Sequence, residues 1–235
     1  IYLDNNDNLY FGETILNIYH IPTKKRKLLE NAPFLPKKLR LGNDFEYIIP
    51  LANDKMLMAT MAGVYEFDAF KNKFDSLNTD GGFWFSLQEF ADRDRHGQIY
   101  SFDPFTGFCV LQLKNNKYHK KYESKTSPIP RHFYDQNDST VWLGTTDGLV
   151  KFDSKKLKIV RTFKRRDGLP NNMVYAITPD TFGFLWLSTN VGISRFNPTT
   201  EEFTNYKSDN NQSENEHNRH AVCTTRDGRI LFGSI

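Results

Sequence analysis

The sequence predicts an all-β fold made of repeated four-stranded antiparallel sheets. Three observations support this class. A short motif recurs at a nearly constant spacing, and the runs between its copies are short and apolar or alternate with the period of strands. In addition, no segment keeps the i, i+3, i+4 apolar spacing of a helix. A period of this size is the signature of stacked supersecondary units, so we expect one sheet for each repeat.

The repeat is clearest in residues 141–153 and 185–197, which read VWLGTTDGLVKFD and LWLSTNVGISRFN. Weaker copies occur in the same frame, each with an aromatic residue or Leu at the position of the Trp. These anchor residues are Tyr10, Leu57, Tyr100, Trp142, Trp186 and Leu231. Their spacings are 47, 43, 42, 44 and 45 residues, a period of about 44.

One unit, residues 171–206, shows how a repeat is expected to fold. Four short strand-like runs, listed here as 173–178, 184–189, 193–196 and 203–206, are separated by turn-forming residues. Such a meander cannot bury both faces alone, and radially arranged four-stranded units of this length form a β-propeller. We therefore predict an incomplete β-propeller over 1–235, with about five blades plus the start of another, because the chain begins and stops inside strand patterns.

Composition excludes several function classes. The chain is 38% hydrophobic and 25% charged, as in ordinary soluble globular proteins. No apolar run is long enough for a transmembrane helix, and no signal peptide is recognisable. The net charge of +3 is too small to indicate nucleic-acid binding. Cys109 and Cys223 lie three repeats apart, so we expect two buried free thiols and not a disulfide.

Catalytic and cofactor motifs are missing from the sequence. It has no Gly-rich phosphate loop, no Gly-x-Ser-x-Gly elbow and no Cys-x-x-Cys, so we predict neither a catalytic residue nor a cofactor. His217 and His220 have no third ligand nearby in sequence, and we predict no metal site. Asp92 and Asp94 are flanked by arginines in 92–97, where we expect a solvated turn and not an acid–base pair.

Two segments resemble a known family. Residues 167–174, DGLPNNMV, followed by the Asp, Gly, Leu-Trp-Leu-Ser-Thr, Gly-Ile and Phe-Asn of 180–197, resemble the two-component-regulator propeller repeat. Residues 215–222 with 227–233 resemble the closing blade of the second propeller in the sensors built from that repeat. The resemblance is good over 130–235 and weaker over 1–129, where the Gly-Leu-Pro-Asn signature is missing.

The resemblance implies a role in sensing. Members of the family are hybrid two-component systems, typical of gut Bacteroidetes, with two extracytoplasmic propellers, a small β-sandwich, one membrane span, a histidine kinase and a receiver with a DNA-binding domain. Their usual ligands are oligosaccharides sensed in the periplasm. This chain would then be a non-enzymatic part of a phosphorelay receptor of the inner membrane. It would contact neither nucleic acid nor membrane itself.

A ligand site is expected where the loops between blades converge on the propeller axis. In the repeat frame these loops are 31–44, 78–85, 124–130, 164–172 and 207–218. Eleven residues before each anchor from the second onward, the sequence has a polar or aromatic residue: Glu46, Glu89, Arg131, Tyr175 and His220. The position two residues later is apolar, so we expect the first set to face the axis. These side chains either line a solvated channel or contact the ligand.

Loop residues add three candidates. Trp84 follows a glycine pair and is either a platform for a sugar ring or buried packing. Arg165 and Arg166 precede the turn at 167–168 and are either a solvated pair or ligands of an acidic or sulfated glycan, whose anionic groups guanidinium matches bidentately.

Two other functions stay open at this stage. Propellers also serve as protein-interaction platforms, and some carry lyase or hydrolase activity. An incomplete propeller would expose sheet edges, and such edges pair with other chains, so a homodimer would be explained without a biological role.

Overall fold

The structure is a computed structural model. It describes residues 2–3, 6–11, 17–28, 45–51, 55–60, 63–71, 73–77, 90–103, 107–115, 117–206 and 217–234. These residues form six antiparallel sheets, five of four strands and one of two. Every strand pairs with its neighbours in sequence, as a meander requires. The predicted all-β class with four-stranded antiparallel sheets is confirmed.

The chain divides into two compact units. Unit 1 comprises Ile1–Arg93 and Gly97–Ser124, and unit 2 comprises Asp94–His96 and Lys125–Ile235. The prediction that 1–235 is one propeller fragment, with about five blades and the start of another, stays a prediction.

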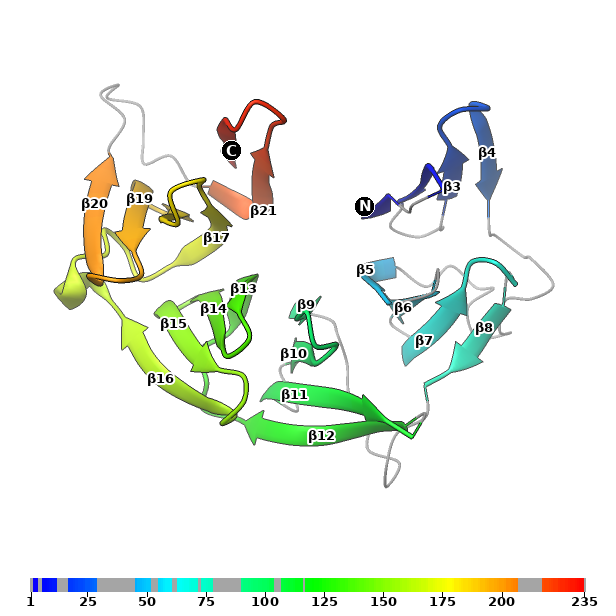
Figure 1. The fold of residues 1–235 in the computed structure, drawn as a ribbon, viewed down its shortest axis with the longest axis horizontal. Coiled ribbons are helices and arrows are strands. Elements are labelled where there is room, and N and C mark those ends of the chain that lie inside the picture. The colour runs from blue at the N-terminus through cyan, green and yellow to red at the C-terminus, as the bar shows by residue number, and fades with distance from the viewer. Residues whose placement is uncertain are drawn as a thin grey trace. The chain divides into compact units, whose positions relative to one another are not determined.

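Unit 1 contains three sheets, coloured blue to green in Figure 1. Their strands are β1 (Tyr2–Leu3), β2 (Asn8–Phe11), β3 (Asn17–His20), β4 (Lys25–Leu28), β5 (Phe45–Pro50), β6 (Lys55–Thr60), β7 (Gly63–Asp68), β8 (Lys73–Ser76), β9 (Phe90–Arg93), β10 (Ile99–Asp103), β11 (Gly107–Lys114) and β12 (Lys117–Ser124). One apolar core lies between the first and second sheets, and another between the second and third.

Unit 2 contains two four-stranded sheets and one two-stranded sheet, coloured green to red in Figure 1. Its elements are β13 (Pro130–Asn137), β14 (Thr140–Thr145), β15 (Gly148–Asp153), β16 (Lys158–Phe163), the 3-10 turn η3 (Arg165–Asp167), β17 (Val174–Pro179), β18 (Leu185–Thr189), β19 (Gly192–Asn197), β20 (Glu202–Tyr206), β21 (His217–Thr224) and β22 (Ile230–Ser234). The first strands are neighbours, because β17 packs against both β13 and β21.

The Thr and Gly of the repeat motif build a hairpin turn. Thr145 Oγ1 donates a hydrogen bond to the carbonyl of Gly148 at 2.7 Å and accepts one at 3.1 Å from the N–H two residues on. Thr189 makes the same pair of bonds, at 3.0 Å to Gly192 and 3.1 Å. Gly148 and Gly192 have φ of 127° and 83°, which a residue without Cβ adopts readily. The Thr-x-x-Gly spacing is therefore a turn signal.

The Trp of the motif is held by an acceptor six residues earlier. Asp180 Oδ2 accepts a hydrogen bond from Trp186 Nε1 at 2.9 Å, and its Oδ1 accepts one from the N–H of Phe184 at 3.0 Å. Trp142 Nε1 donates to Gln136 Oε1 at 2.9 Å in the preceding sheet. The Asp180 side chain thus both shapes the turn between the first two strands of its sheet and orients the indole ring.

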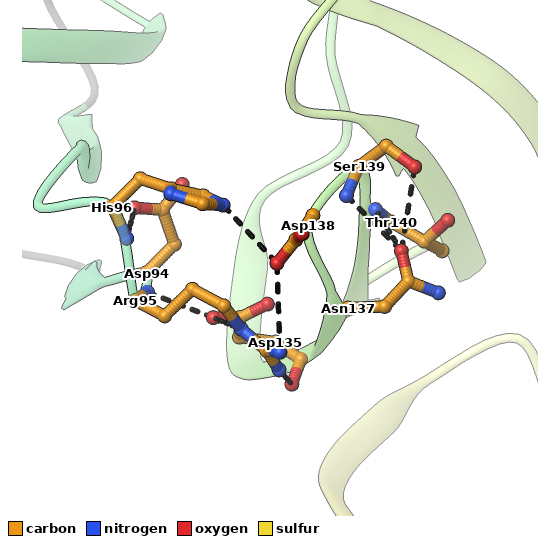
Figure 2. Close-up of polar contacts among 8 residues, drawn as sticks. All are labelled: Asp94, Arg95, His96, Asp135, Asn137, Asp138, Ser139 and Thr140. Carbon is orange, nitrogen blue, oxygen red and sulfur yellow. Dashed lines mark hydrogen bonds and ion pairs between the residues drawn. The ribbon is translucent and has the colours of Figure 1, made fainter.

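The segment Asp94–His96 is bound to Asp135 near the end of β13 and to Asp138 in the turn that follows (Figure 2). Arg95 donates to Asp135 Oδ2 from its backbone N–H at 2.8 Å and from Nε at 2.9 Å, and from Nη2 to the Asp135 carbonyl at 3.0 Å. This bonding raises the pKa of the Arg95 guanidinium. His96 Nε2 lies 3.5 Å from Asp138 Oδ1.

Two expectations are wrong. Neither Asp92 nor Asp94 is solvated as expected. Asp92 belongs to β9, where burial raises the pKa of its carboxyl to about 6, and Asp94 is 4% exposed and accepts a hydrogen bond from the His96 backbone N–H at 2.9 Å. Cys109 is buried as expected, but Cys223 is exposed. Cys223 pairs with Leu231, itself 53% exposed, and no described sheet covers that side of the β21–β22 pair.

Candidate ligand-binding site

The candidate site lies at one end of the sheets of unit 2. We call the end at which the chain enters the first strand of a sheet its leading end. Antiparallel pairing puts the turn between the second and third strands at the same end, and the other two turns at the opposite, trailing end. In unit 2 the described leading ends carry the loops 125–129 and 164–173 and the turns 145–148 and 189–192.

Hydrogen bonds join the leading ends of the first two sheets. Asp147, in the turn between β14 and β15, accepts from Lys164 Nζ and, at 3.2 Å, from Asn172 Nδ2. Asn172 Oδ1 accepts in turn from the backbone N–H of Arg165 at 2.9 Å. The turn of one sheet and the loop before the next therefore form one continuous surface.

The loop 164–173 is ordered by its own residues. Asp167 accepts from the backbone N–H of Lys164 at 2.9 Å and from Arg161 at 3.2 Å, and these bonds lower the pKa of its carboxyl. Gly168 closes η3 with φ of 108°, and Leu169 is buried in the core between the two sheets. The Gly and Leu of the Gly-Leu-Pro-Asn signature are therefore explained by backbone conformation and core packing.

The first strands β5, β13 and β17 each carry a β-bulge at the predicted site position. In β13 the pairing with β14 skips Arg131, and in β17 the pairing with β18 skips Tyr175. Glu46 is skipped in β5 of unit 1. A bulge leaves one residue out of the ladder and re-aims its side chain. The polar position found in the sequence is thus a repeated structural feature.

The described candidates reach the leading end in two ways. Arg131 and Tyr175 are half-buried on neighbouring first strands, whereas Arg165 and Arg166 are exposed on η3. Arg166 lies 3.9 Å from Asp167, and the guanidinium of Arg165 has no ion pair with any described residue.

The other candidates fall outside what the structure describes. Trp84 and Glu89 lie outside the described residues, as do the side chains of Glu46 and His220. Their contact with a ligand, like that of the four described candidates, stays a prediction.

Three polar residues were missed by sequence reasoning. Ser127 Oγ, Ser188 Oγ and Asn190 Oδ1 are buried at the leading ends without a hydrogen-bond partner. An unpartnered buried polar atom is costly, which makes these atoms available to a ligand with matching groups. Ser188 could have been found, because it takes the repeat position that Gly144 holds in the preceding sheet.

The charge of this surface is positive. Arg131, Lys164, Arg165 and Arg166 contribute cations, while Asp147 accepts from Lys164 and Asp167 from Arg161. Guanidinium groups suit carboxylate and sulfate oxygens. Among the described residues, no three His, Cys, Asp or Glu side chains are grouped so that they could hold a metal ion.

Residues 168–191 match the family model of the two component regulator propeller. This stretch is therefore similar to one two-component regulator propeller repeat. It begins at Gly168 within the loop 164–173 and includes the bulge at Tyr175 and the buried polar atoms of Ser188 and Asn190. The repeat thus builds much of the leading end of the β17–β20 sheet.

Solved structures share the fold. The extracellular domain of a hybrid two component system of B. thetaiotaomicron matches with a TM-score of 0.79 at 24% identity, over 99% of this chain and 32% of its own. A second such domain matches with a TM-score of 0.71 at 18% identity, over 100% of this chain and 30% of its own. This chain therefore spans about a third of their length, and the β-propeller fold is confirmed.

An enzyme shares the fold as well. Inactivated virginiamycin B lyase from Staphylococcus aureus, solved with quinupristin, matches with a TM-score of 0.67 at 12% identity, over 99% of this chain and 75% of its own. No curated protein is significantly similar in sequence. No described helix has the length and apolar character needed to cross a membrane.

Proposed function

We propose that this chain belongs to the extracytoplasmic, ligand-sensing propeller region of a hybrid two-component receptor, and that the leading end of unit 2 binds an oligosaccharide. The observation that carries the proposal is the two-component regulator propeller repeat at 168–191, which supplies this end. In the parent receptor, binding in the periplasm would be signalled to a histidine kinase beyond the inner membrane.

The chemistry of the leading end suits a sugar. Hydroxyl groups need both donors and acceptors, which Tyr175, Ser188 and Asn190 provide in a partly buried setting. Arg165 and Arg166 add exposed guanidinium groups, which favour an acidic or sulfated glycan over a neutral one.

A thermal-shift screen of the chain against neutral, acidic and sulfated oligosaccharides tests the proposal. A ligand that binds only the folded state raises the melting temperature. Selective stabilisation by one class supports sensing. A folded protein that responds to none contradicts it, and a captured stable protein partner would favour the interaction-platform function. Turnover of the oligosaccharide would favour a lyase or hydrolase instead.

Two double variants locate the site. Arg165→Ala with Arg166→Ala should weaken binding of an acidic or sulfated hit by about tenfold, because charge-assisted hydrogen bonds are lost. Lys155→Ala with Lys156→Ala removes the same charge at the trailing end of the β13–β16 sheet and should leave affinity unchanged. Arg131→Ala and Trp84→Ala should also weaken binding. Equal effects of the two double variants would contradict this site.

A further inference from the structure

Three hairpin turns of unit 1 share an unusual surface composition. They join β3 to β4, β7 to β8 and β11 to β12. Each hairpin end carries one exposed large apolar residue: Ile21 is 44% exposed, Phe70 86% and Leu113 46%. Beside it each has a pair of exposed lysines, which are Lys24 and Lys25, Lys71 and Lys73, and Lys114 and Lys117. We call these residues together the basic apolar turns of unit 1.

The matching turns of unit 2 lack the apolar residue. Turn 153–158, between β15 and β16, has exposed Lys155 and Lys156, and turn 197–202, between β19 and β20, has exposed Thr199 and Thr200. No large apolar side chain is exposed in either of these turns. Single exposed apolar residues are common on protein surfaces, but here one accompanies paired lysines in three consecutive sheets of one unit. The fold of the repeat therefore does not require this combination.

The basic apolar turns lie at one face of unit 1. Each joins a third strand to a fourth, so each lies at the trailing end of its sheet. The sheets stack in one orientation, because Tyr10 of β2 packs edge to face on Phe67 of β7, and β6 meets β11 in the same way in the next core. At the trailing ends of β5 and β9, Arg93 Nη1 donates to the carbonyl of Pro50 at 3.1 Å. Figure 1 shows the three hairpins in succession along the outer side of unit 1.

Local hydrogen bonds hold the apolar residues at the ends of the hairpins. In the second turn, the N–H of Lys71 donates to Asp68 Oδ1 at 2.8 Å, which closes the chain beside Phe70. In the third, β11 and β12 stay paired up to their last and first residues, so Leu113 lies at the end of a regular ladder. Because the turns are already ordered, binding through them costs little conformational entropy.

The charge of this face is positive. Lys71 and Lys73 are partly neutralised, since they lie 3.5 Å from Asp68 and 2.6 Å from Asp75. The lysines of the first and third turns form no ion pair with a described residue. One exposed carboxylate, Asp7 in the turn between β1 and β2, lies at the same end. The lysines outnumber these acidic residues, so the face attracts a negatively charged partner.

The residue types favour a lipid surface over a protein partner. Protein interfaces are enriched in Arg and depleted in Lys, whereas the segments 21–25, 69–73 and 113–117 contain lysines and no arginine. A lysine stem can lie along apolar groups while its ammonium stays with an anionic headgroup. Each lysine near an anionic membrane adds to the attraction. Separate apolar side chains at one face also suit a planar partner.

We infer that the basic apolar turns of unit 1 bind the surface of an anionic lipid bilayer, with Ile21, Phe70 and Leu113 entering the interface and the lysines contacting headgroups. The resemblance to the sensor family implied that this chain makes no membrane contact of its own, and the inference departs from that expectation. It concerns a different surface from the proposed sugar site of unit 2 and does not depend on it.

Sedimentation of the 1–235 chain with vesicles tests the inference. The chain should bind vesicles of phosphatidylglycerol and phosphatidylcholine in equal parts, but not vesicles of phosphatidylcholine alone. Ile21→Ser, Phe70→Ser and Leu113→Ser combined should weaken binding about tenfold or more without lowering the melting temperature, because the side chains are exposed. Val160→Ser, which removes a 53% exposed side chain from β16, is the matched control and should bind as the unchanged protein does.

A pair of double variants tests the lysines. Lys114→Ala with Lys117→Ala removes the lysines of the third turn and should weaken binding to the anionic vesicles about tenfold. Lys120→Ala with Lys121→Ala removes two lysines from the outer strand β12 of the same hairpin. This control should weaken binding by less than about twofold, because its lysines lie away from the turn. Equal effects of the two double variants would contradict the assigned face.

Phe70→Trp supplies a direct reporter of insertion. The emission that this variant adds to that of the unchanged protein should shift to shorter wavelength on the anionic vesicles, because the indole leaves water. An unshifted emission with the chain bound overturns the inference, as does equal vesicle binding by the triple Ser variant or no binding by the folded, unchanged chain. Binding to soluble polyglutamate as tight as to the vesicles also overturns it, in favour of an acidic protein.

Discussion

The two four-stranded sheets of unit 2 use the same aromatic device with different results. In β13–β16, Trp142 carries Lys151 at 5.5 Å above its ring and packs on Phe163, and both aromatic rings are 0% exposed. In β17–β20, Trp186 has an equivalent cation and an equivalent aromatic neighbour, but Tyr206 is 42% exposed. The contacts within one sheet are therefore not sufficient to bury its Trp, and the next sheet completes the burial.

The largest expected effect separates the two tryptophans. Trp142→Ala should cost about 3–5 kcal/mol of unfolding free energy, because a fully packed aromatic side chain leaves a cavity. Trp186→Ala should cost about 1 kcal/mol, mainly its stacking on Tyr206 and its contact with Arg195. Urea unfolding followed by circular dichroism measures both. Equal losses would show that each repeat buries its own Trp.

A smaller effect is expected at the repeat position two residues after the Trp. A Cβ on Gly144 would lie 2.9 Å from Val174 Cγ1 and 3.0 Å from the Val174 carbonyl, so Gly144→Ala should cost about 1–3 kcal/mol. Ser188→Ala removes a buried hydroxyl without a partner and should be neutral or stabilise by less than about 1 kcal/mol. The melting temperature of each variant, compared with that of the unchanged protein, measures these changes in stability. Destabilisation by Ser188→Ala would indicate a hydrogen bond that the structure does not show.

The smallest effect concerns the loop that joins the two sheets. Because the folded-state pKa of Asp167 is lowered, its carboxylate contributes stability above the ordinary carboxyl pKa near 4, and this is lost as pH falls through the lowered value. Asp167→Asn should therefore lose about 1 kcal/mol at pH 7 and match the unchanged protein near pH 2. Unfolding midpoints across this pH range provide the measurement. A stability difference between the two proteins that grows as the pH falls would contradict the lowered pKa of Asp167.

Much of the fold could be predicted from sequence because the repeat encodes its turns locally. The Thr-x-x-Gly turn and the Asp180 turn are built from hydrogen bonds within a few residues, so their spacing alone predicts the hairpins. The four predicted strands of 171–206 match β17–β20 to within one residue at each end.

Features that depend on more distant neighbours could not be predicted in the same way. The bulges at Arg131 and Tyr175 arise from pairing register, and the burial of Asp92 from packing around β9. Cys223 was expected to be buried like Cys109, but it is exposed beside Leu231 on a strand pair that no described sheet covers on that side. The polar or aromatic residue eleven positions before each anchor was visible as a sequence pattern, whereas the unpartnered hydroxyl oxygen of Ser188 is evident only from the structure.

Hydrogen exchange of the chain, with and without a saturating oligosaccharide selected by the thermal screen, tests the sensing account most directly. Ligand binding at the leading ends of unit 2 should slow exchange in 125–131, 164–176 and 188–192 and leave exchange in the trailing turn 153–158 unchanged. Protection confined to trailing turns, with the ligand bound, would contradict it.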